Sequence, residues 1–247
     1  MTIPSALAFM FPAGYVPWYA LPDPGDTPGT VTVTSTIDMV ADFVVDAGEV
    51  LFASEGATTL ASSWSLPNVT NNGVMWIQHS SAYVTGVKSG NVDLFLNNGT
   101  LNAFSVNHGA TAVYFGSWGI MQNSGIVRAI SYASDAIGYI TWSSSSQNNV
   151  DSSNIGTIEA WSGQGDATGV HLQNAGDFIN TGTIRAVGMS EASAFETSGH
   201  SSILTNSGLI EAVTDGQNSS IAVHNSWSTD MTINNSGIIR GDYAIYA

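Results

Sequence analysis

The pattern of apolar and polar positions along the chain is typical of short β-strands separated by tight turns. Apolar residues do not recur at the three-to-four-residue spacing of an amphipathic helix, and strong helix formers are scarce. Instead, short segments rich in Val, Ile and Thr are bounded by Gly, Asn and Ser, as in Thr183–Val187, Gly169–Leu172 and Phe178–Ile179. The sequence therefore predicts an all-β protein.

One group of residues returns along the chain at a nearly constant interval. It is an asparagine, any residue and a glycine, followed by a pair of residues that is mostly apolar. Seven copies begin at Asn71, Asn97, Asn123, Asn154, Asn180, Asn206 and Asn235. Four of the six intervals between them are identical, and the intervals that follow Asn123 and Asn206 are slightly longer. Repetition at one period indicates a repeat protein in which each interval is one structural unit.

Each interval predicts one coil of a parallel β-helix. We expect three strands in it: one after the Asn-x-Gly turn, one in the middle, and one leading into the next asparagine. Successive coils would stack at the ordinary strand spacing of about 4.8 Å. The predicted fold is an all-β, right-handed parallel β-helix (β-solenoid). It has about seven motif-bearing coils of about 26 residues, preceded by degenerate N-terminal coils.

The residues of the motif predict two internal features. Asn and Gly tolerate the left-handed backbone conformation that we expect at a sharp corner, and stacked Asn side chains can form a hydrogen-bonded ladder along the solenoid. The apolar residue four positions after the asparagine is expected in the core, with a small residue two positions further on. The apolar positions include Ile158, Ile184, Ile210 and Ile239, and the small ones Ala129, Ala160, Ala186, Ala212 and Gly241.

Five positions after the asparagine, the later coils alternate in charge: Arg128, Glu159, Arg185, Glu211 and Arg240. In a parallel stack these side chains would be neighbours on one outward surface. Opposite charges there stabilise by roughly 0.2–1 kcal/mol each, whereas like charges repel. We interpret this charge column as a device that holds the register of the coils, rather than as a catalytic group.

The chain divides into three parts by its pattern. Residues 1–30 are predicted to be an irregular, Pro-rich apolar leader that serves in assembly. Residues 31–70 are predicted to be degenerate first coils and a cap, and residues 71–247 the regular solenoid. The last residues end within a coil, so we expect either more chain beyond Ala247 or a second subunit, with its leader, over that edge.

Composition limits the partners. The chain has 19 acidic and 4 basic residues, a formal net charge of −15, and no cysteine. So few cations cannot form a basic patch, which excludes nucleic acid as an expected partner, and no apolar run is long enough to insert in a membrane. The apolar start lacks a basic region, and the first basic residue is Lys88, so we expect export without an N-terminal Sec signal. No cofactor is required, although the acidic excess is compatible with weak calcium binding.

The repeated phrase that ends in residues 235–247, together with its earlier copies, resembles the β-strand-repeat regions of large bacterial surface proteins. These are autotransporter-like passengers and the N-terminal parts of calcium-binding proteins exported by type I secretion. The resemblance covers about residues 71–247 and implies a solenoid fold and an extracellular or cell-surface location. It implies no shared active site, and the Gly-Gly-x-Gly-x-Asp nonapeptide of calcium-binding repeats is absent from the sequence.

Candidate chemistry is sparse. The carboxylates Asp135, Asp151, Asp166 and Asp177 appear at different places in their coils, which is typical of solvated turns rather than of a hydrolase. The five histidines contain no close metal-ligand pair; His171 and His224 occupy roughly similar mid-coil positions, but they are two coils apart. Aromatic residues are numerous for so polar a chain, and they either fill the core or contact sugars or proteins. They are Trp64, Trp76, Trp118, Trp142, Trp161, Trp227, Tyr114, Tyr132 and Tyr139.

The expected function is structural rather than enzymatic: a self-associating fibre, surface layer or adhesin stalk outside the cell, with head-to-tail or lateral homo-oligomers as partners. Two alternatives stay open on the same fold. One is a polysaccharide lyase or hydrolase, and the other is a module that binds a cell-surface glycan.

Overall fold

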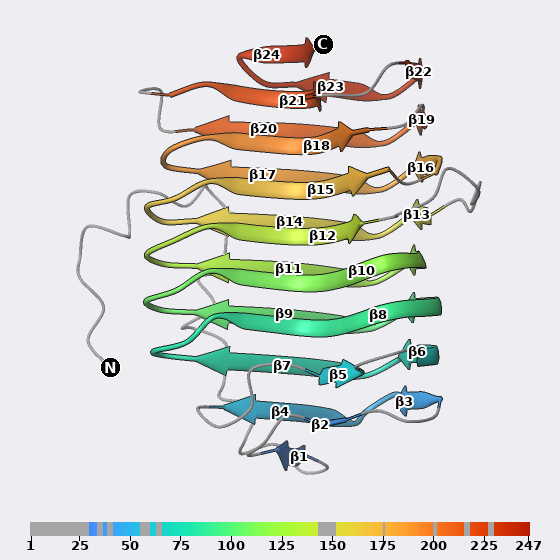
Figure 1. Ribbon diagram of the computed structural model, residues 1–247, viewed down its shortest axis with the longest axis vertical. Coiled ribbons are helices and arrows are strands. Elements are labelled where there is room, and N and C mark those ends of the chain that lie inside the picture. Colours follow the sequence, from blue (N-terminus) through green and yellow to red (C-terminus); the bar gives the residue numbers. More distant parts are fainter. Residues whose placement is uncertain are drawn as a thin grey trace.

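The strands stack as successive coils of one solenoid, as the computed structural model shows (Figure 1). The structure describes residues 30–33, 37–38, 42–54, 60–62, 66–142, 152–174, 176–199, 202–214, 218–226 and 230–247. Within these residues every strand pairing is parallel and there is no helix. The predicted leader, apart from Thr30, lies outside the described residues. The prediction of an all-β parallel solenoid is confirmed, and the stacking is consistent with the right-handed coiling that parallel crossovers adopt.

The strands lie on three faces. Face 1 is a nine-stranded sheet, in spatial order β1 (Thr30–Val33), β4 (Val50–Ser54), β7 (Val74–His79), β9 (Thr100–Ser105), β11 (Ile126–Ser131), β14 (Thr157–Ser162), β17 (Thr183–Gly188), β20 (Leu209–Thr214) and β23 (Ile238–Arg240). The seven strands from β7 to β23 each follow one Asn-x-Gly turn. The motif therefore marks the point where every coil enters face 1.

A second sheet of fifteen strands bends over faces 2 and 3 because two long strands, β8 (Val84–Asn97) and β10 (Ala110–Asn123), run through both. Face 2 also contains β2 (Ile37–Asp38), β5 (Leu60–Ser62), β12 (Ala136–Trp142), β15 (Ala167–Gln173), β18 (Ala192–Ser198), β21 (Ser220–Asn225) and β24 (Tyr243–Tyr246). Face 3 also contains β3 (Phe43–Val45), β6 (Leu66–Asn71), β13 (Ser152–Asn154), β16 (Phe178–Asn180), β19 (Ser202–Asn206) and β22 (Met231–Asn235).

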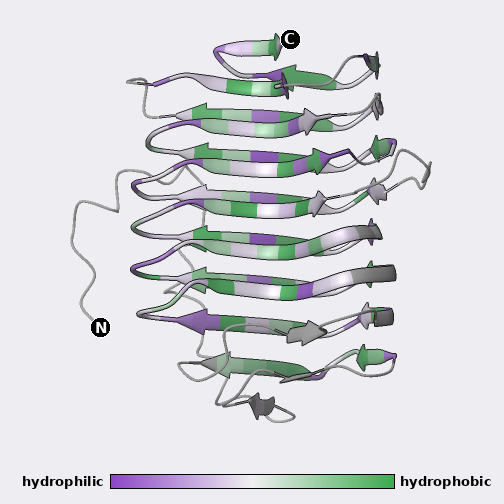
Figure 2. Ribbon diagram, viewed as in Figure 1, coloured by the Kyte–Doolittle hydropathy of each residue, from purple (hydrophilic) through white to green (hydrophobic). Residues whose placement is uncertain are grey.

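The core is a set of stacked columns, because equivalent residues of successive coils are register partners. On face 1, Ile158 pairs with Ile184 and Ile184 with Ile210, and all three side chains are fully buried. The next inward position holds alanine in five successive coils, at Ala103, Ala129, Ala160, Ala186 and Ala212. Apolar and polar residues alternate along these strands (Figure 2). The alternation turns one side of each strand into the core and leaves the other side for surface columns.

Faces 2 and 3 supply the larger core side chains. Phe115 packs edge-to-face on Tyr139 with ring centroids 5.6 Å apart, and Phe178 packs on Phe195 at 5.4 Å. The small residues of face 1 and the aromatic residues opposite them together fill the interior. Because no coil closes a core alone, each one is stabilised by its neighbours.

Candidate functional site

The seven asparagines of the motif lie in one column at the corner between faces 3 and 1. Each one from Asn71 to Asn206 donates its Nδ2 hydrogen to Oδ1 of the next asparagine, at 2.7–2.8 Å. These six side chains are buried, and Asn235 is exposed. A carboxamide both donates and accepts, so identical residues can bond to one another without limit. We call this column the Asn ladder.

The second Nδ2 hydrogen of each asparagine bonds to the backbone. Asn97, for example, lies within 3.1 Å of the Ile126 carbonyl oxygen in the next coil and 3.3 Å of the Gly99 oxygen. The same contacts recur at Asn123 and Asn180. The ladder thus ties side chain to backbone as well as coil to coil, which leaves these buried amides satisfied.

The glycine of the motif is needed for a different reason from the one predicted. Among the described residues a positive φ is found at Gly48, Asn174 and Gly199, none of which belongs to the seven motifs, so the expected left-handed corner is wrong. A Cβ built on Gly182 would instead overlap the backbone oxygen of Gly156 in the preceding coil. Close stacking of one corner on the next, not φ, requires glycine at this position.

A shorter ladder is formed by the middle residue of the Asn-x-Gly motif in three successive coils. Asn98 donates to Oδ1 of Asn72 at 2.8 Å and accepts from the Ser124 hydroxyl at 2.7 Å. These side chains lie on the outside of the corner, and Asn98 and Ser124 are exposed. The next coil has Ile155 here, which is 64% exposed and cannot continue the ladder.

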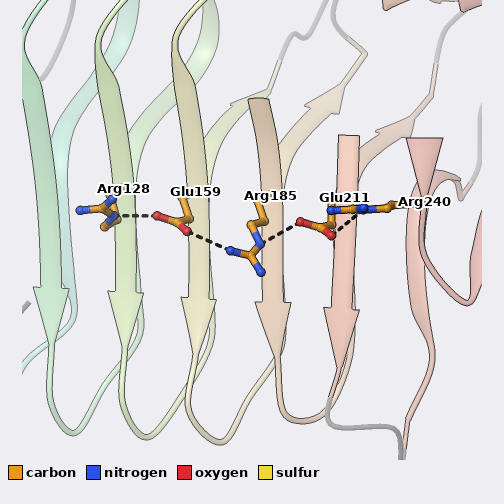
Figure 3. A network of polar contacts seen from close by, with 5 residues as sticks. All are labelled: Arg128, Glu159, Arg185, Glu211 and Arg240. Atoms are coloured by element: carbon orange, nitrogen blue, oxygen red, sulfur yellow. Dashed lines mark hydrogen bonds and ion pairs between the residues drawn. The ribbon is translucent and has the colours of Figure 1, made fainter. Parts of the chain in front are cut away.

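The charge column lies on the outward side of face 1, in register from β11 to β23 (Figure 3). Glu159 accepts from Arg128 Nε at 2.8 Å, and its other oxygen is 4.0 Å from an Arg185 guanidinium nitrogen. Glu211 Oε2 lies 3.0 Å from Arg185 Nε, an ion pair without an aligned hydrogen bond, and Oε1 accepts from Arg240 Nε at 2.6 Å. Each glutamate is therefore shared by two arginines.

Burial makes the loss of one partner of these ion pairs more costly than it is at an ordinary surface pair. The side chains of Glu159 and Glu211 are 10% and 12% exposed, against 62% for Arg240 at the end of the column. Beside the column runs a second apolar cluster of Phe104, Ile130, Trp161 and Val187, in the next outward position of the same strands. Removing one partner would leave a charge half-buried without compensation, which costs more than an exposed pair contributes.

The candidate carboxylates serve as turn residues. Asp135 and Asp166 occupy equivalent places in adjacent coils, so the prediction that they differ in position is wrong for this pair. Asp135 Oδ1 accepts from the backbone nitrogen of Asp166 at 3.1 Å, and Asp166 Oδ1 from that of Glu191 at 3.0 Å. Asp177 accepts from Ile203 N in the same manner, and Asp151 lies outside the described residues. Each carboxylate thus supports the corner of the following coil.

The candidate aromatic residues divide between core and surface. Tyr139 is fully buried, and burial raises the pKa of its hydroxyl to about 12. Trp76 and Trp161 are almost fully buried on the outward side of face 1, whereas Trp142 is 44% exposed on face 2 and lies near Tyr114. Tyr132 is half-buried; Trp64, Trp227 and the side chain of Trp118 are outside the description.

The two histidines that the sequence places at roughly similar mid-coil positions belong to one column of the structure. His171 is the register partner of Glu196, and Glu196 is the partner of His224. The three residues form an outward column on face 2 that sequence reasoning missed. In the part of the chain that the structure describes, no group of three or more His, Cys, Asp or Glu residues is placed to hold a metal ion. No helix among the described residues is long and apolar enough to span a membrane.

The site therefore consists of two polar columns that run along the solenoid, the Asn ladder inside one corner and the charge column outside face 1, and of a ring-bearing surface on face 2. Comparison with known proteins adds no family to this geometry: no protein-family model, no curated protein and no solved structure matches the chain.

Proposed function

We propose that this chain is a rigid structural element of an extracellular or cell-surface protein, such as a stalk, fibre or surface-layer segment. The observation that carries the proposal is the Asn ladder, which continues through seven coils without a missing bond. A ladder of this kind couples every coil to the next in addition to the backbone bonds. It supports a role in which length and stiffness matter.

The charge column supports the same role. It links five successive coils of face 1 through shared glutamates, and it uses three of the four basic residues of the chain. Because most basic residues of the chain form ion pairs within the charge column, few basic side chains remain that could bind an acidic substrate. Its remaining acidity favours solubility and repels copies that approach in the wrong orientation.

The proposed location rests on composition and on the resemblance to β-strand-repeat surface proteins. The chain is acidic, poor in lysine and free of cysteine, which suits an exported repeat protein. Autotransporter-like passengers and type I-secreted proteins are the two classes that the repeated phrase resembles. We propose self-association as the mode of assembly, because parallel coils stack on identical coils by the same column contacts.

Negative-stain electron microscopy of the purified chain, first with calcium and then with chelator, tests the structural role. We expect straight rods of constant width, and fibres or sheets where copies associate; their loss in chelator would show bridging by metal ions. Compact round particles or flexible threads under both conditions would contradict the proposal. Labelling of intact source cells with an antibody to the chain tests the location, since staining only after permeabilisation would rule out a surface protein.

A further inference from the structure

Ring-bearing side chains gather on the outward side of face 2. One outward column holds Lys88, Tyr114, Ile140, His171, Glu196, His224 and Tyr246 as successive register partners. The adjacent column holds Trp142, Gln173 and Ser198. We call the rings of these two columns the ring strip, made of Tyr114, Trp142, His171, His224 and Tyr246. The strip runs along the solenoid axis, with one coil spacing of about 4.8 Å between neighbours in a column.

Near one end of the strip lies a platform around Trp142. This side chain is 44% exposed, and its ring centroid lies 6.4 Å from that of Tyr114. In the preceding coil, the place beside Trp142 is taken by Gly116, where a Cβ would lie 3.6 Å from Gly90 Cα and 3.5 Å from the Tyr114 ring. Gly116 and Gly90 thus place no side chain of their own beside the Tyr114 ring, and Lys88 Nζ lies over that ring, 5.7 Å from its centroid. A flat group can approach the glycine backbone beside Trp142.

Polar side chains continue the platform along the axis. Gln173 follows Trp142 in its column, and Ser198 follows Gln173. The Ser198 hydroxyl lies 3.4 Å from His171 Nε2, and Glu196 accepts from the Ser226 hydroxyl at 3.2 Å. Amide, hydroxyl, imidazole and carboxylate groups therefore lie within one or two coils of the rings. They are the groups that bond to vicinal hydroxyls.

The described residues of the other two faces do not show this combination. The outward side of face 1 is occupied by the ion pairs and by the second apolar cluster. The described outward positions of face 3 present aliphatic and small polar residues, among them Ile179 and Ile203, which are 38% and 40% exposed. Exposed Trp and Tyr beside hydrogen-bonding groups are a feature of face 2.

We propose that the outward side of face 2 binds a neutral polysaccharide chain that lies along the solenoid axis. Sugar rings would stack on Trp142 and Tyr114, and their hydroxyls would bond to Gln173, Ser198 and Glu196. Charge selects the neutral class: the outward column holds one lysine and one glutamate, Lys88 and Glu196, and the chain as a whole carries −15. An acidic polymer would be repelled by that charge. The inference does not depend on whether the solenoid is a stalk or a fibre.

Isothermal titration of the full chain with cello-oligosaccharides, manno-oligosaccharides and oligogalacturonate tests the proposal. We expect saturable binding of at least one neutral series and none of oligogalacturonate. Trp142→Ala should weaken that binding about 2- to 10-fold, since one aromatic stacking contact contributes about 0.5–1.5 kcal/mol. Gln173→Ala should weaken it less, because only one hydrogen bond to the sugar is lost.

The matched control is Ile203→Ala on face 3, which removes an apolar side chain of similar exposure from another face. It should leave binding unchanged. No saturable binding of either neutral series, equal loss in the Trp142 and Ile203 variants, or tighter binding of oligogalacturonate would each overturn the proposal. Sedimentation of the same proteins tests whether a second copy of the chain, instead of a glycan, binds the strip. If the chain self-associates and Trp142→Ala abolishes that association, the strip binds a second copy and the glycan assignment is overturned.

Discussion

The Asn ladder and the charge column run side by side through the same coils, yet they are built by opposite rules. The ladder repeats one residue, is buried, and joins each coil to the next by the same bond. The charge column alternates two residues, lies on the outside, and pairs each glutamate with two arginines. An amide can stack on itself because it donates and accepts, whereas a charge can stack only on its opposite.

The difference has a consequence for specificity. A ladder of identical residues bonds equally well when a coil is skipped, so it favours stacking without fixing which coil is the neighbour. An alternating column penalises every shift by one coil, because it brings like charges together. The ladder therefore supplies stability, and the charge column supplies the order of the coils.

Breaking the corner that carries the ladder should have the largest effect. Gly182→Ala places a methyl group against the backbone oxygen of Gly156, which cannot move without parting two coils. We expect a loss of about 4 kcal/mol in the free energy of unfolding, at the upper end of overpacking effects. Urea denaturation followed by circular dichroism measures it. Gly48→Ala is the comparison, since Gly48 has φ 86° but no neighbour within 4 Å; a larger loss there would contradict the stacking explanation.

Two adjacent asparagines of one turn belong to different ladders, Asn97 to the buried Asn ladder and Asn98 to the exposed outer one, so their variants compare the two. Asn97→Ala leaves one of the two Nδ2 hydrogens of Asn71, and Oδ1 of Asn123, buried without the partner that Asn97 supplies, and we expect a loss of about 3 kcal/mol. Asn98→Ala removes two bonds at an exposed position and should cost less than about 1 kcal/mol. Thermal unfolding of both variants measures the difference. Equal midpoints would show that burial of the ladder is not the source of its stability.

Deleting whole coils tests the charge column against the ladder. Removal of residues 180–205 joins Ile179 to Asn206 and keeps the ladder in step, but it stacks Glu159 on Glu211. Removal of residues 154–205 deletes two coils and stacks Arg128 on Glu211, so the alternation is restored. Opposite-charge pairs and their like-charge replacements differ by about 1–2 kcal/mol here.

We therefore expect the shorter chain to be more stable per coil than the longer one, with the difference reduced in high salt. Adding Glu211→Arg to the one-coil deletion would not serve as a control, because Arg240 follows. Arg128→Glu together with Glu159→Arg in that deletion restores the alternation through Arg240, because the partner of residue 128 in the preceding coil is the uncharged Asn102, and it should recover most of the loss. A one-coil deletion as stable as the two-coil deletion, at low salt, would remove the ordering role of the column.

The period of the motif predicts the fold and the membership of both columns, because the turn before face 1 has constant length. Counting five positions from each asparagine reaches Arg128, Glu159, Arg185, Glu211 and Arg240, which the structure places in one register. Counting could not reveal why glycine is required. The overlap with the preceding coil depends on how closely two corners stack, and no single coil contains that information.

Face 2 was harder to predict because the turn that leads to it varies in length. Glu196 follows the asparagine of its coil one position sooner than His171 does, and His224 follows its own asparagine one position later. A shift of one position moves a side chain to the other side of a strand, so this column is invisible to a fixed offset. Asp135 and Asp166 lie the same number of positions after Asn123 and Asn154. Their equivalence at the preceding corner could therefore have been predicted by counting.

The smallest expected effect is the pH dependence of stability that arises from His171, a titratable residue on face 2. The arginines of face 1 stay charged at all relevant pH, whereas His171 on face 2 is a titratable group. Burial lowers the pKa of His171 below its usual 6.5, with Glu196 raising it and His224 lowering it by smaller amounts. Protonation is then less favourable in the folded chain than in the unfolded one. Stability should be constant above the unfolded pKa and should fall as the pH drops from there through the lower folded-state pKa.

Urea midpoints of the wild-type chain and of His171→Gln, at about pH 7.5 and about pH 5.5, isolate this contribution. The wild-type chain should lose more stability on acidification than the variant, because glutamine has no proton to bind. His108→Gln, at an exposed turn after β9, should behave as the wild type does. If His171→Gln loses as much stability as the wild type, the outward column of face 2 does not sense pH. The His171 side chain would then make no pH-dependent contribution to the stability of face 2.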